Sequence, residues 1–185
     1  PDQPEWLEAA FVQAAAQADA VITSGGVSVG EADHTKAMMK QLGDVAFWRI
    51  AMRPGRPMAV GRIQQGGRSA LLFGLPGNPV AVMVTFAAFV RPALQQLMGW
   101  KASAQPLLKA RAEDSLRKKP GRTEYQRGIV RLANDGQLSV CITGNQGSGV
   151  LNSMVQANGL IVLGHMQGDV QPGDWVDVMM FDGHL

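Results

Sequence analysis

The sequence holds one cysteine, Cys141, among its 185 residues. A lone cysteine cannot form an intrachain disulfide, which excludes the disulfide-stapled folds of small secreted domains. The first four residues, PDQP, do not begin the charged and apolar pattern of a secretory signal peptide. These two absences predict a cytoplasmic location. The chain also lacks an initiator methionine, so we expect it to be a fragment of a longer protein.

Long hydrophobic runs are absent as well. The longest apolar run, Val80 to Val90, is interrupted by Thr85 and closed by Arg91. It is about half of the roughly 20 residues that a membrane-spanning helix needs, so we predict a buried core helix and no membrane anchor. The sequence has no low-complexity segment or internal repeat, and 46% of its residues are hydrophobic. This composition is typical of a packed globular chain.

Lys and Arg are absent from residues 132–185, where five aspartates lie. The net charge of +2 therefore comes from upstream cations. Most of them fall in two groups, which are Arg49, Arg53, Arg56, Arg62 and Arg68, and then Lys109, Arg111, Arg117, Lys118, Lys119, Arg122, Arg127 and Arg131. Because the guanidinium group donates as a planar fork to phosphate and other oxyanions, the arginines favour an anionic ligand.

Aromatic residues are scarce, at 6%, and no aromatic stacking motif accompanies the basic run Arg117–Arg122. Proteins that bind single-stranded nucleic acid combine cations with aromatic platforms. The run is therefore typical of a solvated surface, and we predict no nucleic-acid partner. The three histidines also lack the spacing of zinc ligands.

The sequence does contain two turns rich in glycine and proline, each between an apolar strand-like run and a helical pattern. The first covers Thr23–Gly30 (TSGGVSVG) and the second covers Gly74–Pro79 (GLPGNP). At such a turn in an α/β unit, the new helix directs unpaired N–H groups and its positive dipole end toward the crevice. Two of these turns on one sheet predict one anion pocket.

The first turn has an alternative interpretation, because glycine also ends strands tightly where no ligand binds. Ser24 and Ser28 favour the ligand, since they add hydroxyl donors to the backbone N–H groups. Asp33 is either a helix N-cap or a carboxylate that faces the anion across Mg²⁺. In the second case, Asp33 and Asp2 are candidate metal-facing or acid–base residues.

Arg49, Arg53 and Arg56 lie on or beside a turn fixed by prolines. A solvated strand surface is one interpretation. The other is an oxyanion site, because even spacing puts Arg49 and Arg53 on one face if the strand extends that far. Pro54 and Pro57 would leave this turn little entropy to lose on binding. The sequence leaves both interpretations open.

The element pattern predicts an α/β domain over residues 1–100 and a β domain over residues 101–185. In the first, we expect helices over about 5–18 and from Asp33 to Gly43, a core helix capped by Asn78, and strands at 20–23, 45–52, 57–63 and 69–73. In the second, we expect a small barrel or sandwich with strands at about 107–113, 125–133, 137–143, 159–163 and 174–180, and a hairpin turn at 134–136.

Together these residues resemble the MoeA-type molybdopterin molybdenumtransferases, the family that includes the gephyrin E domain. The resemblance covers essentially the whole chain. It rests on motifs that occur in the family's order: Ser24–Asp33 (SGGVSVGEAD), Arg53–Pro57 (RPGRP), Leu75–Pro79 (LPGNP), Pro120–Arg122 with Gln126–Gly128, and Gly144–Ser148 (GNQGS).

The resemblance implies a three-layer molybdopterin-binding α/β domain, incomplete at its N-terminus, followed by a small all-β C-terminal domain. The implied reaction is hydrolysis of adenylylated molybdopterin with Mg²⁺ present, transfer of molybdate to the dithiolene sulfurs, and release of AMP. A homodimer and contact with molybdopterin adenylyltransferase are implied as well. The alternative is a noncatalytic molybdopterin-binding or gephyrin-like scaffold module.

The resemblance also implies roles for individual positions. The expected catalytic residues are Asp2, Asp33, Arg49, Arg53 and Arg56, of which Asp2 and Asp33 would also hold Mg²⁺. The expected residues for binding molybdopterin or molybdate are Ser24, Gly25, Gly26, Ser28, Gly30, Pro76, Gly77, Asn78, Pro79, Arg127 and Ser148.

Overall fold

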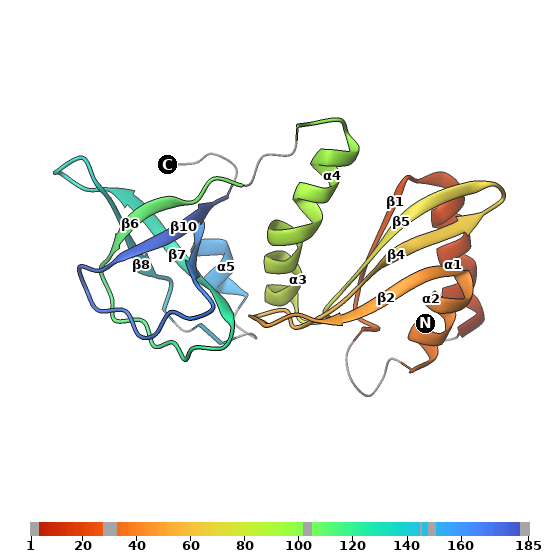
Figure 1. Ribbon diagram of the computed structural model, residues 1–185, viewed down its shortest axis with the longest axis horizontal. Coiled ribbons are helices and arrows are strands. Elements are labelled where there is room, and N and C mark those ends of the chain that lie inside the picture. Colours follow the sequence, from red (N-terminus) through yellow and green to blue (C-terminus); the bar gives the residue numbers. More distant parts are fainter. Residues whose placement is uncertain (1–3, 28–32, 102–104, 145, 148–150, 182–185) are drawn as a thin grey trace. The chain divides into compact units, whose positions relative to one another are not determined.

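The computed structural model describes residues 4–27, 33–101, 105–144, 146–147 and 151–181 (Figure 1). The chain divides into two compact units. The first comprises Pro1–Ile50 and Gly55–Trp100, and the second comprises Ala51–Pro54 and Lys101–Leu185. Residues 51–54, which the sequence assigns to the α/β domain, therefore cluster with the second unit.

The first unit is built on a four-stranded sheet in the order β1-β5-β4-β2. These strands are β1 (Ala20–Ser24), β5 (Arg68–Leu75), β4 (Pro57–Gln65) and β2 (Gly43–Arg49). β1 pairs with β5 in parallel, whereas β4 is antiparallel to both β5 and β2. β1, β5 and β2 therefore run in the same direction and end at the same edge of the sheet.

Helices lie on both faces of this sheet (Figure 1). Side chains of a strand alternate between the two faces, so each face presents apolar residues for a helix to cover. On β5, Ala70 and Leu72 join the core beneath α1 (Pro4–Gln17) and α2 (Asp33–Leu42). Phe73 and Leu75 join the opposite core, which contains Val90 of the third helical segment. The three-layer α/β architecture expected from the sequence is thus confirmed.

The third helical segment begins at α3 (Pro79–Thr85), passes through a π-helical turn η1 (Phe86–Val90), and ends as α4 (Arg91–Leu97). Val80, Val84 and Val90 are buried, but Met83, Phe86 and Phe89 are exposed. The predicted core helix is therefore present but buries one side only, the side that packs on the sheet. Among the described residues, this is the one helix whose length and composition would suit a membrane span, a test that core helices of soluble proteins also pass.

The second unit is a small β barrel. Its strands are β6 (Leu108–Ala112), β7 (Thr123–Leu132), β8 (Leu138–Ile142), β9 (Gly159–Leu163) and β10 (Trp175–Met180). They follow the order β7-β8-β6-β10-β9, and the pairing of β7 with β9 closes the ring. Val130, Val140, Ile161 and Val178 fill its interior. The structure thus selects the barrel over the sandwich.

Two further elements of this unit were not predicted. β3 (Met52–Arg53) pairs in parallel with the start of β7, and the Thr123 N–H donates to the Ala51 carbonyl at 2.9 Å. A short helix, α5 (Asn152–Gln156), precedes β9. The predicted hairpin turn between β7 and β8 is present, with Gly136 at φ 79°. In the left-handed region, glycine carries no steric cost.

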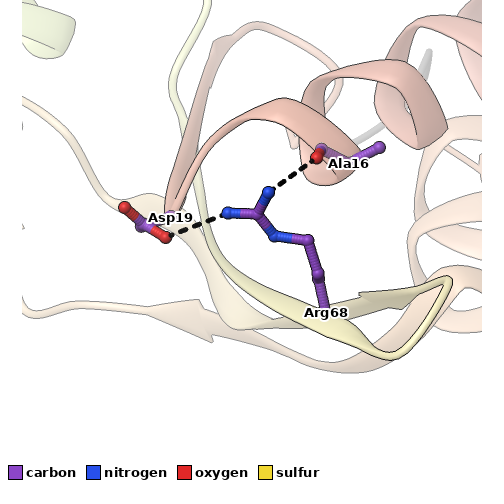
Figure 2. A network of polar contacts seen from close by, with 3 residues as sticks. All are labelled: Ala16, Asp19 and Arg68. Atoms are coloured by element: carbon purple, nitrogen blue, oxygen red, sulfur yellow. Dashed lines mark hydrogen bonds and ion pairs between the residues drawn. The ribbon is translucent and has the colours of Figure 1, made fainter.

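Arg68, one of the five arginines of the upstream group, ties the β4–β5 hairpin to the end of α1 (Figure 2). Its guanidinium donates to the Ala16 carbonyl at 3.3 Å and lies 3.8 Å from the Asp19 carboxylate. Both side chains of the ion pair are exposed, so the contact contributes little to stability. Arg68 therefore acts locally on the fold.

Candidate functional site

The two glycine-rich turns lie side by side at the edge where β1 and β5 end. Ser24 and Leu75 are register partners at the last position of the parallel pair. The Gly25 N–H, at the start of the first turn, donates to the Leu75 carbonyl at 3.0 Å. A Cβ placed on Gly77 of the second turn would lie 3.6 Å from the Gly25 Cα, which is van der Waals contact. Ligands of α/β proteins commonly bind at this edge of a sheet.

Glycine is required at three positions around the first turn. Gly25 and Gly26 have φ angles of 89° and 72°, a region that other residues rarely adopt. A Cβ on Gly74 would lie 2.8 Å from Val27 Cγ1 and 3.0 Å from Ala59 Cβ. The absence of a side chain at Gly74 lets Val27 pack into the core beneath α2, which draws the turn down onto the sheet.

The second turn ends in a capped helix. The Asn78 side-chain oxygen accepts from the Ala81 N–H at 3.2 Å, and Pro79 occupies the first turn of α3. This confirms the N-cap predicted from the Asn-Pro pair. Pro76 is buried, whereas Gly77 and Pro79 are exposed. The buried Pro76 anchors the turn, and Gly77 and Pro79 form the part of the turn that faces solvent.

Two hydroxyl groups flank the end of β1. Ser24 is exposed, so its hydroxyl is accessible beside the first turn. The Thr23 Oγ1 is buried and has no hydrogen-bond partner within the described part of the chain. An unpaired buried hydroxyl costs free energy of folding.

Arg49 and Arg56 lie at the same edge of the sheet as the two turns. Arg49 ends β2 and pairs with Pro57, and the Ile50 N–H donates to the Arg56 carbonyl at 2.8 Å. Extension of the strand registers aligns Gly25, Pro76, Pro57 and Arg49 in one row across the sheet. The row spans about 14 Å at the usual strand spacing. Arg49 in the row and Arg56 beside Pro57 are both exposed, and their positive charge makes this edge suitable for an elongated anion.

Arg53 does not share a strand with Arg49, so the condition under which even spacing would put both on one face is not met. β2 ends at Arg49, and the chain crosses at Ile50 and Ala51 to form β3 in the sheet of the second unit. There, Arg53 is the register partner of Glu124 on β7. The Arg53–Pro54 peptide bond is cis, and Gly55 follows with φ 94°.

Arg127 holds the chain that follows β8, and its side chain is 1% exposed. Its Nε donates to Ser153 Oγ and its Nη2 to the Gly147 carbonyl, both at 3.0 Å. Gln146 brackets the same residue, since its side chain accepts from the Arg127 N–H and donates to the Arg127 carbonyl. Burial lowers the pKa of the guanidinium. A direct role for Arg127 in ligand binding stays a prediction.

Several expected site residues cannot be placed. Asp2, Ser28, Gly30 and Ser148 lie outside the described residues, and so does the side chain of Asp33, the first residue of α2. In the part of the chain that is described, no three His, Cys, Asp or Glu side chains come together as a metal site. The Mg²⁺ assignment to Asp2 and Asp33 stays a prediction.

Glu124 is a buried acidic residue beside Arg53 that sequence reasoning did not single out. It is 7% exposed and lies on β7, next to Arg53 on β3. The predicted strand began at 125, one residue too late to include it. The available signal was the alternation of Gln126, Gly128 and Val130, which places Glu124 on the same face of the strand as a core valine.

Two family models match this chain. Residues 1–96 match a probable molybdopterin binding domain, and residues 109–181 match the MoeA C-terminal region, domain IV. A molybdopterin molybdenumtransferase of Haemophilus influenzae is 44% identical over 186 residues, which is 100% of this chain and 45% of that protein. Gephyrin of Dictyostelium discoideum is 32% identical over 199 residues, covering 97% of this chain and 28% of gephyrin.

Solved structures agree with the two-unit architecture. A molybdenum cofactor biosynthesis protein from Pyrococcus furiosus matches with a TM-score of 0.72 and 28% identity, over 98% of this chain and 56% of that one. The molybdopterin biosynthesis moeA protein from Pyrococcus horikosii matches with a TM-score of 0.74 and 27% identity, over 99% of this chain and 42% of that one. The chain thus spans about half or less of these relatives. It belongs to the MoeA-type molybdopterin molybdenumtransferase family, of which it carries the molybdopterin-binding α/β domain and the C-terminal β barrel.

Proposed function

We propose that this chain is part of an enzyme that inserts molybdate into adenylylated molybdopterin and releases AMP. The observation that carries the proposal is the row at the sheet edge, where the two turns contact each other through the Gly25–Leu75 hydrogen bond. Arg49 ends the row, and Arg56 lies one residue beyond Pro57. A phosphate-linked pterin and an oxyanion need hydrogen-bond donors and fixed positive charge, and this edge offers both.

The proposed roles divide along this row. The turn at Gly25 and Gly26, with the Ser24 hydroxyl, binds a phosphate of the ligand, and Pro76 to Pro79 support it from the second turn. Arg49 and Arg56 bind molybdate as a substrate. Arg53, on β3 of the second unit, keeps its assignment as a catalytic residue. Asp2 and Asp33 offer the carboxylate oxygens that Mg²⁺ prefers, and the ion would supply charge neutralisation at the ligand phosphates. Ser28, Gly30 and Ser148 keep their assignments as ligand contacts.

Calorimetric titration of the 185-residue chain with AMP, molybdopterin and molybdate tests the binding half of the proposal. We expect Arg56→Ala to weaken molybdate binding about tenfold, since a charge-assisted contact contributes about 1.5–3 kcal/mol. Arg62→Ala is the matched control. Arg62 is also exposed, but it lies on β4 about 17 Å from the edge. Equal affinity of the two variants would overturn the assignment of the edge.

A chimera tests the catalytic half. The matched 186 residues of the Haemophilus influenzae relative would be replaced by this chain, and molybdate insertion would be assayed with the purified protein. Insertion that Arg53→Ala abolishes supports the transferase. Ligand binding without insertion favours the noncatalytic scaffold, which the gephyrin match makes the second candidate. A homodimer is part of the proposal, so the molar mass of the same protein would be measured by light scattering. Contact with molybdopterin adenylyltransferase is also part of the proposal.

A further inference from the structure

Glu124 occupies a largely buried position on β7. The residue is 7% exposed, and no described residue donates a hydrogen bond to its side chain or forms an ion pair with it. Its backbone lies between two strands, since Glu124 is the register partner of Leu163 on β9 and of Arg53 on β3. An opposite charge close to a partly desolvated carboxylate stabilises its ionised form, so a cation near Glu124 is the kind of partner to look for.

Leu163, the register partner on β9, and Lys118, a buried cation of the same unit, are poor candidates for that partner. Leu163 is a fully buried core residue and offers no donor. Lys118 is buried too, but its ammonium already donates to the carbonyls of Gln167, Lys119 and His165, at 2.8, 3.3 and 3.4 Å. Its donors are therefore occupied by backbone oxygens.

Two arginines on β7 or beside it are weaker candidates. Arg127 lies three residues along the strand, an odd spacing that places it on the opposite face, and it donates to Ser153 and Gly147. Arg122 is half-buried and precedes the first residue of β7. It is not a register partner of Glu124 on an adjacent strand.

Arg53 is both adjacent to Glu124 and able to pair with it. Register partners on adjacent strands point to the same face, with Cβ atoms about 5 Å apart, within reach of an arginine side chain. Arg53 is exposed and makes no ion pair or hydrogen bond with another described residue. We propose that Glu124 is a positioning residue whose carboxylate orients the Arg53 guanidinium, leaving part of the guanidinium free for an oxyanion.

This proposal deepens the proposed function, on which its choice of ligand rests. A guanidinium has five N–H donors, and a carboxylate accepts two of them along one edge. The remaining donors of Arg53 would then point in a fixed direction. A preorganised fork loses less conformational entropy when it binds an oxyanion, so the pairing would raise the affinity for molybdate.

A double-mutant cycle tests the pairing without any ligand. The whole chain would carry Arg53→Met, Glu124→Gln, or both. For each variant we would measure the midpoint of thermal unfolding and, separately, the hydrogen exchange of the β7 amides. We expect Arg53→Met to lower the midpoint by about 2–4 °C because it leaves the carboxylate without its counter-charge. Glu124→Gln should restore most of that loss. Additive effects of the two changes would overturn the pairing.

Two matched controls and a spectroscopic readout separate positioning from general stability. Arg122→Met removes the neighbouring cation, and Glu113→Gln removes an exposed carboxylate from the same unit. In the NMR spectrum, the Arg53 Nε–H signal should be sharp in the wild type and in Glu113→Gln, and broadened in Glu124→Gln. Arg53→Lys keeps the charge without the fork, so it reports on the pair if Arg53→Met does not fold. An Arg53 signal unaffected by Glu124→Gln contradicts the proposal.

Molybdate titration then measures the functional consequence. Glu124→Gln should weaken binding about tenfold when Arg53 is present and less than twofold in the Arg53→Met background. Equal weakening in both backgrounds overturns the positioning role. Failure of the wild-type chain to bind molybdate would instead count against the proposed function, while the unfolding cycle and the Arg53 signal would still decide the pairing.

Discussion

Two threonines of the first unit show how much one hydroxyl depends on its surroundings. Thr85 is fully buried in α3, and its Oγ1 donates to the Ala81 carbonyl at 2.7 Å. The Thr23 Oγ1 is buried at the end of β1 and has no partner among the residues described. The same functional group is therefore satisfied at one position and unsatisfied at the other, and the free energy of unfolding should reflect this.

We expect Thr23→Val to raise the free energy of unfolding by about 1 kcal/mol, because it removes an unpaired hydroxyl and keeps the branched shape. Thr85→Val is the matched control and should lower it by about 1 kcal/mol, since a made hydrogen bond is lost. Urea unfolding of both variants measures the difference. Destabilisation by Thr23→Val equal to that by Thr85→Val would mean that the Thr23 hydroxyl has a partner.

At the scale of elements, the sequence predicted what local pattern controls. The Asn-Pro pair predicted the start of α3, and the Asn-Asp-Gly turn predicted the β7–β8 hairpin. It could not predict that the chain leaves the first sheet after Arg49 and pairs at Arg53 with a strand 71 positions further along. Partner choice between distant strands depends on tertiary packing, which no local pattern encodes.

The residues of the candidate site also differ in whether the sequence could identify them. Its turns and its arginines were recognisable because glycine, proline and arginine carry their physical properties with them. Glu124 was not recognisable, because the role that we propose for it depends on burial beside a strand that is remote in the sequence. The exposed face of the third helical segment was missed for a related reason. Its apolar residues encircle the helix, so periodicity could not show which side the sheet covers.

The cap of α3 gives a prediction that separates folding from binding. Asn78→Ala should lower the free energy of unfolding by about 1 kcal/mol, because the Ala81 N–H loses its acceptor. Asn78→Ser and Asn78→Asp should both keep the cap. Only the aspartate adds negative charge where we propose that a phosphate binds, so it should weaken AMP binding several-fold in calorimetry. Equal AMP affinity for the serine and aspartate variants would place the phosphate away from this cap.

At the scale of the whole molecule, the two units are not two continuous stretches of sequence. Ten of the described residues form a buried core of the barrel's own, all of them between residues 110 and 178. However, residues 51–54 belong to the barrel unit, and β3 pairs with the first two residues of β7. A polypeptide of residues 101–185 would keep the closed ring of strands and lose the strand that covers the start of β7.

We therefore expect the polypeptide 101–185 to fold as a barrel with a locally weakened β7. The Thr123 N–H loses the Ala51 carbonyl, so its hydrogen exchange should be at least about tenfold faster than in the whole chain, which corresponds to about 1.4 kcal/mol of local opening. Cys141 on β8 is the internal control. Its N–H lies in the β7–β8 pairing, which this polypeptide retains, so its exchange should change little. Faster exchange of both amides to the same extent, or failure of the polypeptide to fold, would mean that the barrel depends on the first unit for more than β3.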